Sequence, residues 1–117
     1  MKFSTEQIDN TVILTLKNKA INSEIAPELK AKLLILCQPD IEALIVDFTN
    51  VETIDSSGIG ALLLAQRQMN EYGLPVILAG INEQVYTLLE MLHLEEFFDI
   101  YDTLEEALKD TNEIEEE

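Results

Sequence analysis

The segment that most constrains the fold joins an apolar run with strand character to an apolar run with helical character. Residues 43–48 predict a buried strand, and residues 59–65 predict a helix packed on a sheet. Between them lies an Asp-Ser-Ser-Gly motif, in which we expect Ser56 or Ser57 to be the helix N-cap. The free N–H groups and partial positive charge of a helix start accept a hydroxyl, a carboxylate or a phosphate. A serine at this point could therefore carry a switch.

Strand and helix patterns alternate along the rest of the chain. Residues 3–8 and 12–16 flank the turn-prone pair Asp9-Asn10 and predict a hairpin. A helix is expected over 25–36, with Asn22 or Ser23 as its cap and Pro39 beyond its end.

Two further strands and three helices follow in the same manner. The helix beginning at Ser57 should stop at Gly73, and strands are expected over 76–79 and 98–101. Asn82 should cap the third helix, and Thr103 begins a capping box that opens the last. We therefore predict an α/β fold: one mixed, mostly parallel β-sheet with about four helices packed on it.

The length of 117 residues is enough for one domain with one core. No linker rich in Pro, Gly or Ser divides the chain. We expect the domain to span residues 1–110. Residues 111–117 carry four glutamates and too little apolar surface to order themselves, which predicts a disordered, solvated tail.

The charge balance restricts the partners. Twenty-three acidic residues against seven basic ones give a formal net charge of −16, which repels nucleic acid and anionic lipid surfaces. The same charge would speed encounter with a basic protein surface, although acidity also serves solubility alone.

The sequence lacks a second cysteine and a targeting or membrane-spanning segment, and these absences predict the state of the thiol and the cellular compartment of the protein. Cys37 is the single cysteine, so no intrachain disulfide can form, and its apolar neighbours predict a buried thiol. The first residues show no signal pattern, and no apolar run reaches membrane-spanning length. We expect a cytoplasmic protein without membrane insertion.

Catalytic and cofactor signals are weak. His93, between two leucines at a helix end, is better explained by a structural role than by base catalysis, although a triad with Ser57 stays open on sequence alone. The Gly58–Gly60 spacing matches no nucleotide-binding loop, and we expect both glycines to let the helix start approach the sheet. Asp47 and Asp55 are a poor metal pair. No enzyme activity, metal or cofactor is predicted.

At the Asp55–Gly60 motif, with the strand before it and the helix and Gly73–Leu78 after it, the chain resembles the STAS domain family. This family is shared by bacterial anti-sigma factor antagonists and the cytosolic parts of sulphate transporters. The resemblance covers about residues 11–110. It implies that Ser57, the second serine, is phosphorylated by a partner anti-sigma kinase.

The resemblance also implies a mechanism and partners. Unphosphorylated protein would bind an anti-sigma factor with serine kinase activity, phosphorylation would end binding, and a phosphoserine phosphatase would restore it. Transcription would thus be regulated indirectly.

The partner-binding surface is expected where parallel strands gather their loops. It should contain Asn22, Ser23, Asp55, Ser56, Ser57, Gly58 and Ile59. We expect Ile59 to be a partly exposed apolar anchor, with a core position as the alternative. Family antagonists usually carry an acidic residue where an ungapped alignment places Asn22, so the charge at this position is lost.

Two other functions stay open at this stage. The domain could be a scaffold subunit of a membrane-transport or stress-signalling complex in which Ser57 is only a helix cap. It could also be a small hydrolase.

Overall fold

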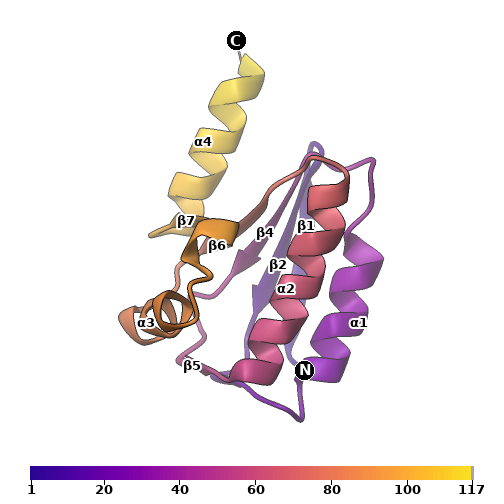
Figure 1. Cartoon of the computed structure of the whole chain (residues 1–117). Helices are drawn as coiled ribbons and strands as arrows, with labels where there is room; N and C mark the ends of the chain where they lie inside the picture. Colours follow the sequence, from indigo (N-terminus) through magenta and orange to yellow (C-terminus); the bar gives the residue numbers. More distant parts are fainter. Residues whose placement is uncertain (117) are drawn as a thin grey trace.

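A computed structural model describes residues 1–116 of the chain, with side chains described for residues 1–111. The elements alternate as an α/β fold requires (Figure 1). In order they are β1 (Phe3–Ile8), β2 (Thr11–Leu16), β3 (Ala20–Ile21), α1 (Ala26–Leu36), β4 (Ala43–Asp47), β5 (Thr53–Ile54), α2 (Ser56–Glu71), β6 (Val76–Ala79), α3 (Glu83–Met91), a 3-10 turn (Glu95–Phe97), β7 (Asp99–Tyr101) and α4 (Leu104–Glu116).

The main sheet has five strands in the order β1-β2-β4-β6-β7. β1 and β2 are antiparallel, while each later pair is parallel, so the predicted mixed, mostly parallel sheet with four helices is confirmed. A second sheet consists of β3 and β5, which pair in parallel over two residues each. The sequence analysis missed this small sheet because a two-residue strand has no periodicity to detect.

Alternating side chains divide the core between the two faces of the sheet. Leu44 and Val46 of β4 point to the side covered by α1, α2 and α3, whereas Ala43 and Ile45 point to the side where Ala107 of α4 packs. Figure 1 shows α1 and α2 side by side over one face, with both helices starting at the same end. The beginnings of these helices and the carboxyl ends of the parallel strands therefore share one edge of the domain.

The start of α1 differs from the prediction. Its N-cap is Ile25, which makes no side-chain capping bond, instead of Asn22 or Ser23. The Asn22 side chain accepts a hydrogen bond from the Glu24 N–H at 3.0 Å, and the backbone carbonyl of Asn22 accepts from the N–H groups of Ile25 and Ala26. The asparagine is thus used in the turn before the helix, and the helix starts three residues later.

The C-terminal boundary lies inside a helix. The predicted change from domain to tail at residue 110 falls within α4, which continues to Glu116, and Glu117 lies outside the described residues. The extent of the domain stays a prediction.

Two remaining expectations concern the thiol and the membrane. Cys37 is 1% exposed, as predicted, and burial raises the pKa of its thiol from 9.0 to about 11. Among the described residues, no helix combines the length and apolar character needed to cross a bilayer.

Candidate functional site

Asp55 organises the turn between β5 and α2. It is the N-cap of α2, and its Oδ1 accepts hydrogen bonds from the backbone N–H of Ser57 at 3.0 Å and of Gly58 at 3.2 Å. The prediction that Ser56 or Ser57 caps this helix is therefore wrong. A carboxylate accepts two backbone donors more strongly than a neutral hydroxyl would, and it also complements the helix dipole.

The Ser57 hydroxyl is held by the same carboxylate. Its Oγ donates to Asp55 Oδ1 at 2.5 Å, so the serine is oriented by Asp55. This bond, followed by the N–H groups of Gly58, Ser57 and Ser23, keeps the pKa of the Asp55 carboxyl below its usual value. Asp55 is thus ionised at neutral pH, and Ser57 is half-buried with its oxygen fixed at the helix start.

The small β3–β5 sheet brings a second segment to this turn. The register pairs Ile21 with Ile54, and the Asp55 N–H donates to the Ile21 carbonyl at 3.1 Å. Asn22 and Ser23, which follow β3 directly, therefore lie beside Asp55. The structure brings together the polar members of the predicted surface: Asn22, Ser23, Asp55, Ser56 and Ser57.

The two apolar members lie beneath that surface. Ile59 is 3% exposed and belongs to the core, so the expectation of an exposed anchor is wrong and the core alternative is correct. Ile59 follows the cap by four residues, which places it one turn along α2 on the face toward the sheet. Gly58 is also buried, and a Cβ added there would lie 2.6 Å from Ile54 Cγ1 and 2.9 Å from Ile21 Cγ2.

The Ser57 side of the turn opens into a groove between α1 and α2. The groove has a volume of about 530 Å³, and Ser57 and Ser23 lie among its lining residues. Lys30 of α1 and Arg67 of α2 also line it. Sequence reasoning missed these two cations, since nothing in their local patterns indicates that two separate helices bring them to one groove.

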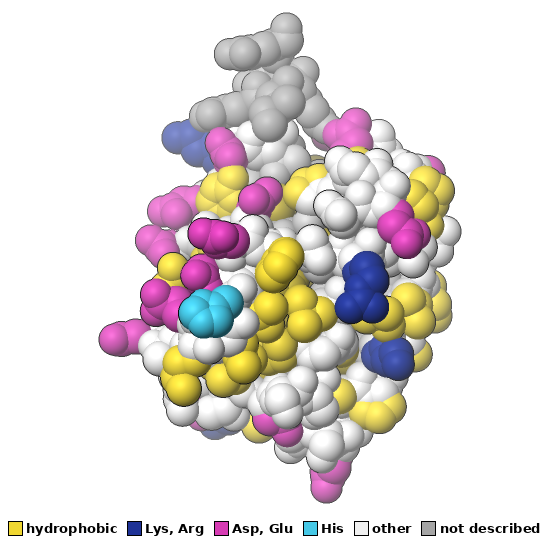
Figure 2. All heavy atoms as spheres, viewed as in Figure 1, with side chains coloured by type: hydrophobic (Ala, Val, Ile, Leu, Met, Phe, Trp, Pro, Cys, Tyr) yellow, Lys and Arg dark blue, Asp and Glu magenta, His cyan; other side chains and the backbone are white. Residues whose placement is uncertain are grey.

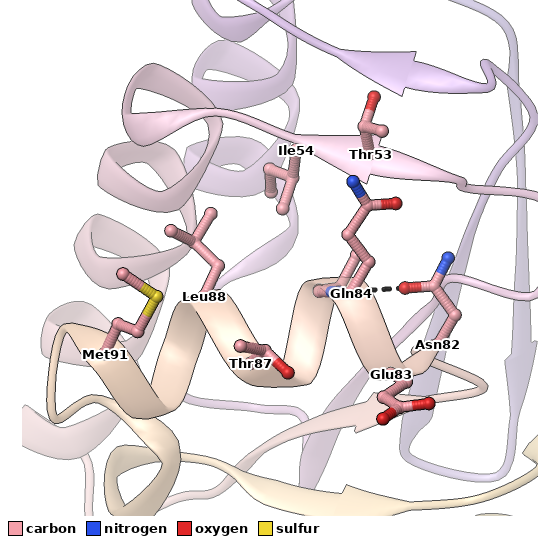
Figure 3. Close-up of a pocket in the computed structure, with 9 residues that line it drawn as sticks. Thr53, Ile54, Asn82, Glu83, Gln84, Thr87, Leu88 and Met91 are labelled. Atoms are coloured by element: carbon pink, nitrogen blue, oxygen red, sulfur yellow. Dashed lines mark hydrogen bonds between the residues drawn. The ribbon is translucent and has the colours of Figure 1, made fainter.

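A second groove, of about 740 Å³, lies between β5 and α3. Figure 3 shows Ile54 and Leu88 facing one another across it, with Met91 at one end. At the other end Asn82 caps α3 as predicted, accepting from the Val85 N–H at 2.8 Å. Because Ile54 directly precedes Asp55, the Asp55–Ser57 turn lies between the two grooves.

Charge is unevenly spread over the face seen in Figure 2. Acidic side chains gather on the side of α3 and α4, whereas basic side chains lie over α1 and α2 and also beside α4. His93 is exposed and has a left-handed backbone with a φ of 58°. Within residues 1–111, no group of three or more His, Cys, Asp or Glu side chains is arranged to hold a metal ion.

Replacing Asp55 with alanine should lower the melting temperature by a few degrees at neutral pH, because two backbone donors lose their acceptor. The pKa of Asp55 is lower in the folded state, so its stabilisation is complete above the unfolded pKa and is lost as pH falls through the folded one. The difference between wild type and Asp55→Ala should therefore shrink below about pH 4. Thermal melts across this range measure it. The control Asp55→Asn keeps a capping side chain without this titration, and an unchanged gap at low pH would contradict the role of the charge.

The fold and the turn together define a class of protein: a single α/β domain that presents an oriented serine at the start of a helix. The family model of the STAS domain matches residues 2–107, and the chain belongs to this family. The resemblance carried by the Asp-Ser-Ser-Gly motif is thereby confirmed.

Solved structures agree with this assignment. A candidate anti-sigma factor antagonist of Thermotoga maritima is 26% identical, with a TM-score of 0.80 and 92% of each chain covered. The Bacillus cell fate determinant SpoIIAA in its phosphorylated form is 21% identical, with a TM-score of 0.75 over 94% of this chain and 99% of that one. A sulfate transporter family protein of Wolinella succinogenes is 21% identical, with a TM-score of 0.81 over 94% and 91%. SpoIIAA in its unphosphorylated form, 22% identical with a TM-score of 0.72 over 95% of this chain and 98% of that one, is described as an anti-sigma factor antagonist, so the structural neighbours include antagonists as well as a transporter-family protein.

Proposed function

We propose that this chain is an anti-sigma factor antagonist whose binding to an anti-sigma factor is switched off by phosphorylation of Ser57. The observation that carries the proposal is the Ser57 hydroxyl, which stands at the start of α2 and is oriented by a hydrogen bond to Asp55. Two neighbours support it: the candidate antagonist of Thermotoga maritima, and SpoIIAA, which is described as an anti-sigma factor antagonist and whose structure is also known in a phosphorylated form.

The position suits a phosphoacceptor for two reasons. The serine is half-buried and lines a groove, so a kinase can reach its oxygen while the fold supports the backbone. The hydroxyl points to Asp55, which limits the rotamers available to the attacking oxygen. In this proposal Asp55 is a positioning residue, and the kinase supplies the nucleotide, the metal and the catalytic groups.

A phosphate on Ser57 would act on the partner more than on the fold. The helix dipole favours the added negative charge, whereas the neighbouring Asp55 carboxylate opposes it, so the two effects partly cancel. A partner surface fitted to a neutral hydroxyl must instead accept a group with a charge of about −1.5 to −2, at a cost of several kcal/mol. At about 1.4 kcal/mol for each tenfold in affinity, this ends a complex of moderate strength.

The partners of this cycle follow from the switch. The unphosphorylated chain binds an anti-sigma factor with serine kinase activity and frees the sigma factor, and a phosphoserine phosphatase returns the chain to its binding state. The chain works by binding in the cytoplasm, without its own catalysis or cofactor. Asn22, Ser23, Asp55 and Ser56 surround Ser57 and complete the proposed contact area.

The test is a phosphorylation assay with ATP and the purified anti-sigma kinases encoded in the same genome. We expect one kinase to add a single phosphate and mass spectrometry to locate it on Ser57. Phosphate on Ser56 or elsewhere would refute the assignment of the acceptor. If none of the kinases modifies or binds the chain, the antagonist proposal fails and the scaffold alternative gains support.

A further inference from the structure

The packing of α2 requires a glycine at position 58 but not at position 60. Gly58 is required, because the two isoleucine contacts described above leave no room for a Cβ. At Gly60, a Cβ would meet no atom within 4 Å, and the residue is exposed in the helix interior. The expectation that both glycines serve the approach of the helix to the sheet is therefore correct only for Gly58.

Glycine inside a helix is unfavourable relative to alanine, so Gly60 weakens α2 without any packing need in the described structure. Gly60 lines the α1–α2 groove together with two other small residues, Ala61 of α2 and Ala26 of α1. The missing side chain of Gly60 therefore leaves the groove open at this position. Such an opening lets the backbone or a large side chain of a second molecule approach closely.

The charge of the groove indicates what that molecule presents. Lys30 and Arg67 line the groove, although the chain has only seven basic residues and a net charge of −16. Among residues 1–111, neither cation has an ion-pair partner. Leu63 and Leu64 of α2 add apolar surface to the lining. A groove with an apolar lining and two cations fits an amphipathic helix that carries carboxylates.

We propose that the α1–α2 groove is the docking site for an acidic amphipathic helix of the partner protein, which packs against Gly60 and pairs its carboxylates with Lys30 and Arg67. The inference rests on the proposed function and adds the chemistry of the partner segment. Ser57 stands at one end of the same groove, so a phosphate there competes with the partner's carboxylates for the nearby cations. The local charge of the groove, opposite to that of the whole chain, selects an acidic segment.

The first experiment separates stability from binding. Gly60→Ala should raise the melting temperature by about 3–6 °C, because an exposed helix interior gains from alanine. It should also weaken binding of the kinase that phosphorylates Ser57 by at least about tenfold, because the methyl group fills the place of close approach. Asn70→Ala, at an exposed position of α2 outside the groove, should stabilise the domain and leave binding unchanged. Gly58→Ala should instead lower the melting temperature.

The second experiment tests the charges. Lys30→Glu and Arg67→Glu should each weaken kinase binding about tenfold or more, with the loss reduced at high salt. Lys109→Glu, on α4, changes the net charge by the same amount and should have little effect on kinase binding. Unchanged binding by Gly60→Ala and by both groove reversals, with Ser57→Asp still blocking the complex, would overturn the docking site and leave the antagonist proposal intact.

A third arm needs no kinase. Two synthetic amphipathic helical peptides share one apolar face and carry either Glu or Lys on their flanks. The Glu peptide should shift the NMR amide signals of Gly60, Ala61 and Leu64, and the shifts should vanish in Lys30→Glu. Binding of the Lys peptide alone, or no shift of the groove amides at millimolar Glu peptide, would overturn the inference even if no kinase is found.

Discussion

Ile59→Glu should unfold the domain instead of detaching a partner. Ile59 is 3% exposed and packs in the core between α2 and the sheet, so the substitution buries a carboxylate without a partner. The lost apolar contact and the desolvation of the charge together cost about 3–5 kcal/mol or more. The total free energy of unfolding of a domain of this size is about 5–15 kcal/mol. A melting transition that is lost or strongly lowered at neutral pH is the expected result, measured by circular dichroism and calorimetry.

The pH dependence of the stability of Ile59→Glu shows whether the buried carboxylate causes the destabilisation. Burial raises the pKa of the introduced carboxyl above its unfolded value, so the protonated form is favoured in the folded state. Stability is therefore lost as pH rises between the two values and is partly recovered in mild acid. Ile35→Glu makes the same chemical change on α1, where the side chain is 65% exposed, and should melt like the wild type. A normal transition for Ile59→Glu would show that Ile59 does not pack as described.

Ser57→Asp should keep the fold and abolish partner binding. The variant loses the hydrogen bond from Ser57 Oγ to Asp55 and places a second carboxylate beside it, while the helix dipole offsets part of this cost. The melting temperature should change by only a few degrees. The charge meets a partner surface fitted to a hydroxyl, so affinity for the anti-sigma kinase should fall about tenfold or more.

Ser57→Ala separates charge from shape at the same position. It removes the acceptor oxygen without adding charge, so the variant should still bind the anti-sigma kinase. Incubation of the complex with ATP should then no longer end binding. Titration calorimetry with and without prior incubation with ATP measures both effects. If Ser57→Asp unfolds the domain, the phosphate would act through the fold, and the interface mechanism would be wrong.

Long patterns in the sequence predicted most of the architecture. The hairpin around Asp9, the buried run of β4 and the cap at Asn82 agree with the structure because each depends on neighbouring residues only. The motif that starts at Asp55 predicted the family in the same way, since strand, turn and helix follow each other directly.

The details of the site were harder to predict from the sequence, because they depend on contacts between distant segments. The choice of Asp55 over Ser56 and Ser57 as the N-cap is decided by backbone geometry at one residue, where the sequence offers three suitable side chains. The burial of Ile59 depends on the angle at which α2 meets the sheet. The groove unites Lys30 with Arg67, which lie 37 positions apart, and no periodicity relates them.

The strand order of the main sheet has a consequence for synthesis of the chain. In the order β1-β2-β4-β6-β7, every new strand joins the edge left by the one before, and none has to insert between two strands already paired. A nascent chain leaving the ribosome can thus extend its sheet in one direction as residues emerge. The three-residue strand β7 closes the series last, so the growing edge stays available for mispairing until Tyr101 has been made.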